Sequence, residues 1–172
     1  TRDIELMLMR TWPAIEERIY DGWVLRFSKG YTKRSNCINP LYESYFDLEE
    51  KFEYCRKIYE EKRLPIIYKL IDTKVSLMVD EFLEKKGLKK QDMVTVKEID
   101  LTDVDYNLKS ISINWGFSKE WYDFYTAENN LNTEEKDILK KLLEKNDKNN
   151  VYVYKSINNE IIAVAMGSVE KN

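Results

Sequence analysis

The spacing of hydrophobic side chains near the amino terminus predicts helical structure. Apolar residues between Ile4 and Ile19 recur at intervals of three and four positions, which is the spacing of an amphipathic helix. Pro13 interrupts this run, and a proline is best tolerated in the first turn of a helix. We therefore expect a first helix that breaks near Trp12 and a second short helix that begins at Pro13.

The next residues change from a helical to an alternating pattern. Trp23, Leu25 and Phe27 lie two positions apart, as in a strand with one buried face. Residues 28–30 have turn composition, and an extended run follows over residues 32–39. The sequence therefore predicts a β-hairpin over residues 22–39 whose three large side chains face a helix-covered core.

Further helices and strands are predicted before residue 105. Asp47 and Glu50 have the spacing of a helix cap, and an apolar stripe follows them up to about Lys62. A second stripe is ended by Gly87, a residue type that often follows the last turn of a helix. The expected elements are a helix over 47–62, a strand over 66–71, a helix over 75–83 and a strand over 94–99.

From about residue 101 the pattern begins again, with helices followed by a hairpin. Asn132 and Glu135 have the spacing of a capping box, and Asn158 with Asn159 is a turn sequence that hairpins favour. The expected elements are helices over 119–126 and 132–143 and strands over 151–156 and 161–169. We interpret this order as a weak internal duplication. The predicted fold is α+β, a mixed or antiparallel sheet with flanking helices, divided into residues 1–104 and 105–172.

Composition narrows the class of protein. Of the 172 residues, 43% are hydrophobic and 13% aromatic, which is enough to build a core. The net charge of -3 argues against a dedicated nucleic-acid binder. The longest apolar run, Ile161 to Met166, is far too short for a membrane span. We therefore expect a cytoplasmic protein that binds neither nucleic acid nor membrane.

The lack of histidine in the sequence limits its chemistry. With no histidine among the 172 residues, Ser-His-Asp and Cys-His mechanisms are excluded for this chain. Cys37 and Cys55 do not have CxxC spacing, so neither a metal site nor a disulfide is expected. Any acid or base must come from Glu, Asp, Tyr, Cys, water or the backbone.

A cluster of polar residues is the first candidate binding site. If the apolar side chains of the strand at 23–27 face the core, Arg26 points the other way. Arg34 and Asn36 share a face of the neighbouring predicted strand. Such a cluster either binds an anionic or carbonyl-bearing group or is merely solvated, and the sequence leaves both interpretations open.

Three segments in the first forty residues resemble a known family. They are Trp12-Pro13-Ala14, Asp21-Gly22-Trp23-Val24-Leu25-Arg26 and Gly30-Tyr31-Thr32-Lys33-Arg34-Ser35-Asn36. Together they resemble the opening of bacterial GNAT-type N-acetyltransferases that are built from two GNAT-like halves. The resemblance implies transfer of an acetyl group from acetyl-CoA to the primary amine of a small molecule or peptide, without a metal. It leaves a homodimer open.

The loop that binds the cofactor in this family has no counterpart in the sequence. In GNAT domains the backbone N–H groups of a glycine-rich loop at a helix start hold the pyrophosphate of acetyl-CoA. The equivalent helix of the first half follows residues 39–46, which contain Glu43 and no glycine. The sequence ends at Asn172, before the equivalent loop of the second half. We therefore expect a degenerate first unit and the beginning of a second one, in a truncated chain that does not bind acetyl-CoA by itself.

The resemblance also points to residues of the second unit. Trp121 and Tyr125 fall where GNAT enzymes often admit the acceptor amine between two helices, although packing of an aromatic helix face explains them more simply. Glu170 either serves as a water-linked base in a complete enzyme or is solvated. The alternative to an enzyme is a non-catalytic GNAT-like module that binds a ligand or assembles with a partner.

Overall fold

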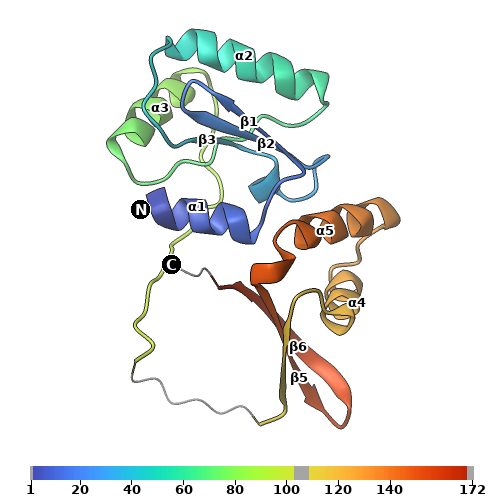
Figure 1. Ribbon diagram of the computed structural model, residues 1–172. Coiled ribbons are helices and arrows are strands. Elements are labelled where there is room, and N and C mark those ends of the chain that lie inside the picture. Colours follow the sequence, from blue (N-terminus) through green and yellow to red (C-terminus); the bar gives the residue numbers. More distant parts are fainter. Residues whose placement is uncertain (1, 103–108, 170–172) are drawn as a thin grey trace.

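The computed structural model of the chain describes residues 2–102 and 109–169 and contains two sheets with helices around them (Figure 1). Each sheet has three antiparallel strands, in the orders β1-β2-β3 and β4-β5-β6. The predicted α+β class is therefore confirmed. The helices and strands are α1 (Arg2–Thr11), β1 (Glu16–Tyr20), β2 (Trp23–Phe27), β3 (Ile38–Pro40), α2 (Leu48–Glu61), α3 (Lys74–Lys85), β4 (Ile111–Trp115), α4 (Lys119–Glu128), α5 (Thr133–Lys145), β5 (Asn150–Ile157) and β6 (Glu160–Ser168).

The first sheet begins with a hairpin that lies earlier in the chain than predicted. Asp21 and Gly22 have φ angles of +40° and +79°, and this Asp-Gly turn reverses the chain between β1 and β2. The prediction of a second short helix after Pro13 is therefore wrong. The spacing of Ile15 and Ile19 fits a helix, but residues 16–20 instead pair along their whole length with β2.

The predicted pairing over residues 22–39 is confirmed in part. β2 pairs antiparallel with β3, but a loop that contains a short 3-10 helix, Lys33–Ser35, replaces most of the expected second strand. Trp23, Leu25 and Phe27 are at most 3% exposed and belong to the main core of the first unit. The predicted core face of this strand is thus confirmed.

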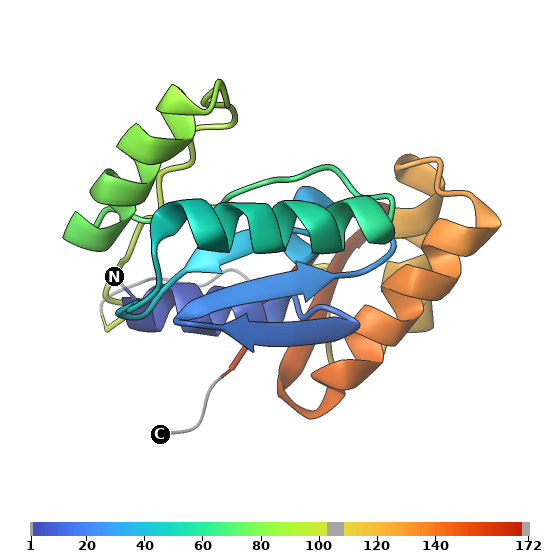
Figure 2. The same ribbon diagram turned by 90° about the horizontal axis from the view of Figure 1, so that it is seen from above.

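Helices cover both faces of the first sheet. α2 and α3 pack on the face that carries Trp23 and Leu25, and they contribute Phe52 and Val79 to that core. α1 lies across the opposite face, where Met9 meets Val24. Figure 1 shows α2 and α1 on opposite sides of the strands, and in Figure 2, seen from above, α2 is nearest the viewer. Because helices cover both of its faces, this sheet forms the middle of three layers.

Two strands expected later in the first unit do not form as predicted. The extended segment 66–71 joins the sheet only through a parallel bridge between Tyr68 and Ile38. Residues 94–99 form no strand, and the exposed fractions of Val94 and Ile99 are 80% and 74%. Alternating side chains stabilise a strand only when a neighbouring strand offers backbone and side-chain partners. The prediction for 94–99 is therefore wrong.

The second unit agrees more closely with its predicted elements. The helices α4 and α5 and the hairpin β5–β6 lie within a few residues of their expected positions, and the turn residues Asn158 and Asn159 have positive φ angles. Asn132 and Glu135 form the predicted capping box at the start of α5. The sequence pattern missed β4, which pairs with β5 as an edge strand. The proposed division at 104 and 105 lies outside the described residues.

In the part of the chain that the structure describes, helices pack on one face of the second sheet. Trp121 of α4 and Leu139 of α5 pack with Tyr152 of β5, and Figure 1 shows both helices on the same side of this sheet. On the opposite face, Ile113 and Trp115 of β4 are 49% and 65% exposed.

None of the helices in the described ranges is long and apolar enough to cross a membrane.

Candidate functional site

Arg26, predicted to lie on a polar surface, is buried and holds the first unit together. The residue is 2% exposed, and its guanidinium donates to the carbonyl oxygens of Met9 at 3.1 Å and Trp12 at 2.6 Å. It also donates to the Arg34 carbonyl oxygen at 2.7 Å and to the Glu17 carboxylate at 2.9 Å. A cation that neutralises carbonyls at the end of α1 is favourable for the helix. Arg26 thus connects α1, β1 and the loop before β3.

Asn36 closes the loop between β2 and β3. Its Oδ1 accepts hydrogen bonds from the backbone N–H groups of Ser28 and Gly30, at 2.7 and 3.0 Å. Its Nδ2 donates to the carbonyl oxygens of Tyr31 and Thr32, at 2.8 and 2.9 Å. The residue is 1% exposed, and its four backbone partners all belong to the segment that leads from β2 into this loop. Asn36 therefore shapes the backbone of the loop from within.

The structure separates the three members of the predicted polar cluster. Arg34 is exposed and its guanidinium lies 5.5 Å from the ring centroid of Trp12, whereas Arg26 and Asn36 are buried. The expectation that all three project from one surface is wrong, because the side chains of Arg26 and Asn36 are buried and hydrogen-bonded to backbone atoms around β2. Their role in binding a substrate stays a prediction.

Trp121 and Tyr125 are brought together at the junction of the two units. Their rings stack with a centroid distance of 4.7 Å and an interplanar angle of 9°. Trp121 is 3% exposed and packs with Trp12 and Tyr31 of the first unit. Burial and the proximity of Tyr125 raise the pKa of Tyr31 well above its usual range. This arrangement favours the packing interpretation, and the acceptor-binding role of the two residues stays a prediction.

Lys145 at the end of α5 also joins the two units, and its sequence context gave no sign of this role. Its ammonium group donates to the carbonyl oxygens of Ala14 and Ile15, at 2.6 and 2.7 Å. A shallow cavity of about 190 Å³ lies beside this contact, smaller than most ligand pockets. Its walls are formed by Leu6, Met9, Arg10, Pro13, Ala14, Glu17 and Lys145.

A buried ion pair lies at the start of α2, between Lys51 of that helix and Asp21 of the turn between β1 and β2. The Asp21 carboxylate accepts hydrogen bonds from the backbone N–H groups of Tyr45 and Phe46, at 3.0 and 2.9 Å, and from the Ser44 hydroxyl at 2.7 Å. The Lys51 ammonium lies 3.1 Å from the same carboxylate and also donates to the Asp21 carbonyl oxygen. The side chains of Lys51 and Asp21 are 0% and 7% exposed. A carboxylate of the protein thus occupies a cluster of donors suited to an anion.

The pKa values of this pair follow from the same contacts. Desolvation would raise the pKa of Asp21, but the donors of Phe46, Ser44 and Tyr45 and the Lys51 ammonium outweigh it and hold the pKa well below its usual range. Burial lowers the pKa of Lys51, and the neighbouring Asp21 carboxylate offsets only part of that effect. Asp21 is therefore charged at neutral pH.

The sequence contained two signals for this ion pair. Asp21-Gly22 is a strong turn sequence, and Lys51 interrupts the apolar stripe of α2 between Leu48 and Phe52. A lysine on the buried face of a helix needs an anionic partner. What the sequence did not show is the fold of the loop, which packs so closely that a Cβ at Gly22 would lie 2.3 Å from the Glu43 carbonyl oxygen.

Two further predictions concern the sites of a base and of a metal. Glu170, the candidate base, lies outside the described residues. Within residues 2–102 and 109–169, no group of three or more Cys, Asp or Glu side chains is arranged to hold a metal ion.

Comparison with known proteins identifies a family. A family model described as "Probable histone acetyltransferase Rv0428c C-terminal" matches residues 1–169. No curated protein and no solved structure matches the chain. The match covers both sheets and the junction between them.

Proposed function

The chain belongs to the family of the C-terminal region of the probable histone acetyltransferase Rv0428c, and from this premise we propose that it forms part of a GNAT-type N-acetyltransferase. The observation that carries the proposal is the extent of the family match, residues 1–169. The arrangement of the second unit supports it, because the helix pair α4–α5 followed by the hairpin β5–β6 has the order expected at the beginning of a GNAT domain.

The proposed reaction transfers an acetyl group from acetyl-CoA to a primary amine. The amine nitrogen attacks the thioester carbonyl, a C–N bond forms and the C–S bond breaks, so that an amide and free CoA result. The amine first gives a proton to a base or water, and the CoA sulfur takes up a proton. A backbone N–H that polarises the carbonyl and the alignment of both substrates supply the rate advantage.

We assign the two units different parts in this function. The first unit, proposed to end at residue 104, keeps its own carboxylate at the start of α2, and that charge opposes a phosphate guest. We therefore place acetyl-CoA binding elsewhere and expect residues 1–172 alone to lack it. The second unit, from residue 105, is the proposed site of acceptor binding, beside α4 and α5.

The rival proposal is a binding or assembly module without chemistry. It is favoured by the buried pair of Asp21 and Lys51, because a unit whose anion site is filled internally has no evident use for a phosphorylated cofactor. It would account for the first unit but leaves the family match of the second unit unexplained.

The proposal is tested by measuring both cofactor binding and amide formation. The natural protein in which this sequence occurs is incubated with acetyl-CoA and a panel of primary amines, and the amide and free CoA are quantified by mass spectrometry. We expect both products in equal amounts. In parallel, residues 1–172 are titrated with acetyl-CoA in a calorimeter, where we expect no saturable heat at micromolar ligand.

The outcomes separate the two proposals. Amide formation by the natural protein supports the acetyltransferase, whereas its absence with every amine favours the module. Saturable binding of acetyl-CoA to residues 1–172 would contradict the assignment of the first unit and locate a cofactor site within them.

A further inference from the structure

The loop before α2 carries an unusual concentration of exposed aromatic side chains. Tyr45 is 88% exposed and Phe46 is 49% exposed, although aromatic side chains are normally withdrawn from water. The ring of Phe46 lies 5.7 Å from that of Tyr20, which in turn stacks on Tyr54 of α2 at 3.7 Å. Exposed apolar side chains that gather in one place mark interaction sites more often than isolated ones do.

One carboxylate lies beside these rings and a second is close to them in the sequence. Glu50 of α2 has its Oε1 3.5 Å from the Tyr20 hydroxyl, and Glu43 lies two residues before Tyr45. Within the described part of the chain, no cationic side chain forms an ion pair with Glu43 or Glu50. Residues 42–53 contain five carboxylates and one ammonium, and that ammonium is paired internally with Asp21. Glu49 pairs with Lys86 and Glu53 with Arg56, so the excess negative charge comes from the remaining three carboxylates. The surface therefore repels anions and attracts cations.

The loop that presents the rings is held rigidly from below. The backbone N–H groups of Tyr45 and Phe46 both bind the Asp21 carboxylate, which is fixed by the buried Lys51. These bonds use the backbone and leave both aromatic side chains directed outward. Because the backbone is already fixed, a partner would not have to order the loop, and this lowers the entropy cost of binding.

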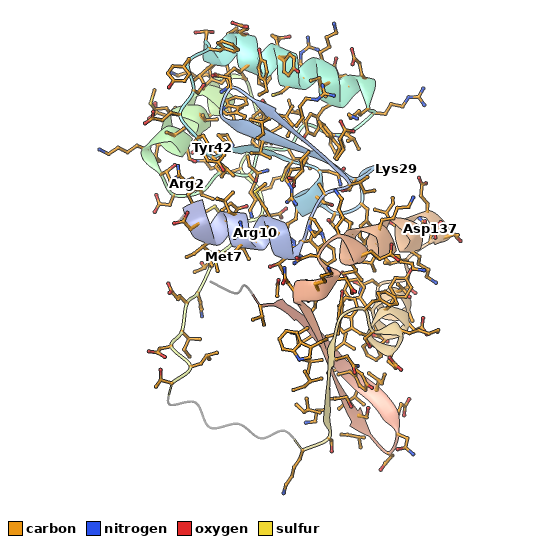
Figure 3. All side chains as sticks on the ribbon, in the orientation of Figure 1. Arg2, Met7, Arg10, Lys29, Tyr42 and Asp137 are labelled. Carbon is orange, nitrogen blue, oxygen red and sulfur yellow. The ribbon has the colours of Figure 1, made fainter. Side chains whose placement is uncertain are left out.

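The chain itself places a cation on another ring of this loop. The guanidinium of Arg2 lies 5.3 Å from the ring centroid of Tyr42, and Figure 3 shows these two side chains next to each other. Electron-rich ring faces bordered by carboxylates are the chemistry that recognises lysine and arginine side chains.

We propose that Tyr20, Tyr45, Phe46, Glu50 and Tyr54 form a docking surface for a lysine- or arginine-rich polypeptide segment. The cationic side chains of the partner lie over the exposed rings, and the carboxylates neutralise their charge. Interaction at this surface goes beyond the proposed acetyl transfer and does not depend on it. A test by binding alone therefore separates failure of the docking surface from failure of the enzyme proposal.

The test uses a fluorescent synthetic peptide that carries several lysines and the purified chain, with binding measured by fluorescence anisotropy. The control peptide has the same sequence with every lysine acetylated, which removes the charge and keeps the length. We expect binding of the lysine peptide that weakens as salt is raised from low to high ionic strength, and no binding of the acetylated peptide.

Variants assign the binding to the surface. The double variant Tyr45→Ala with Phe46→Ala should weaken binding about tenfold, since each exposed ring contributes part of a cation–π interaction. Glu50→Gln should weaken it by about threefold. Glu61→Gln, at the other end of α2 and also exposed, is the matched control and should leave binding unchanged. Phe46→Tyr keeps the aromatic ring and should retain affinity.

Several results would overturn the proposal. These are equal binding of the acetylated peptide, no change in the double variant, an equal loss in Glu61→Gln, or no binding of the lysine peptide at low salt. Circular dichroism of each variant checks that the fold is retained, which is expected because the substituted side chains are exposed and the backbone bonds to Asp21 remain.

Discussion

The two sheets have the same number of strands but differ in how they are covered. In the first sheet every residue of the central strand β2 is buried, because α2 and α3 cover one face and α1 covers the other. In the second sheet, α4 and α5 cover one face, and no other helix of residues 2–102 and 109–169 covers the opposite face. On its other face, Ile113 pairs with Val153, which pairs in turn with Ala165, so a row of apolar side chains crosses the sheet without a helix above it.

Because of this difference, we expect the two units to be stabilised by different contacts. Apolar side chains stabilise a fold in proportion to the area that folding removes from water. The first sheet gains from both of its faces. The second gains from one face and from its contact with the first unit, where Trp12 and Tyr31 join the aromatic core around Trp121 and Lys145 binds two carbonyl oxygens. The second unit therefore depends more on its neighbour than the first does.

The largest effect is expected from removing the central side chain of the first sheet. Trp23 is 0% exposed, lies edge-on to Tyr68 at 5.6 Å and has the Lys51 ammonium 4.2 Å from its ring centroid. Trp23→Ala should lower the free energy of unfolding by about 3–5 kcal/mol, as large truncations in a core do. Denaturant melts measure this change. A loss below about 1 kcal/mol would show that the face is assigned wrongly.

A smaller and pH-dependent effect is expected from the buried carboxylate of the first unit. Because the pKa of Asp21 is lower in the folded than in the unfolded chain, its contribution to stability is present above the unfolded pKa, about 4. This contribution is lost as the pH falls below that value. Asp21→Asn should therefore be less stable than the wild type at pH 7, and the difference should shrink in acid.

The matched control for this prediction lies in the second unit. Asp123 pairs with Lys119 on the exposed surface of α4, where solvent screens the interaction. Asp123→Asn should leave the urea midpoint unchanged at pH 7. Urea melts of both variants between pH 7 and pH 2.5 measure the comparison. If the deficit of Asp21→Asn keeps its full size at pH 2.5, the charge of the carboxylate is not what stabilises the loop.

The sequence predicted the helices better than the sheets, for a physical reason. A helix satisfies its own backbone, so caps such as Asn132 with Glu135 and the apolar stripe of α5 are visible in a short window. A strand needs a neighbouring strand, and the local sequence pattern does not identify which segment that will be. Residues 94–99 alternate like a strand and remain unpaired, whereas Ile111–Trp115 form β4 because β5 lies beside them.

The candidate sites were harder to predict than the fold. Arg26 was expected on a surface because it alternates with core residues. However, α1 covers that face of β2 as well, so the Arg26 side chain is buried and donates hydrogen bonds to carbonyl oxygens of Met9 and Trp12. Asp21 and Lys51 are 30 positions apart, and only the fold of the loop before α2 brings them together. By contrast, Trp121 and Tyr125 are one helical turn apart, so their common face was readable from spacing.

The smallest effect is expected from the same substitution in the second sheet, and it tests the comparison directly. Trp115 is 65% exposed on the uncovered face, so Trp115→Ala removes few contacts and should change the free energy of unfolding by about 0.5 kcal/mol or less. Comparing it with Trp23→Ala holds the chemistry of the change constant and varies only the covering. The melts should be run at two protein concentrations, because burial against another copy would make the stability depend on concentration. A loss of several kcal/mol, or a dependence on concentration that the substitution abolishes, would mean that this face is covered in solution and that the second sheet is buried on both sides like the first.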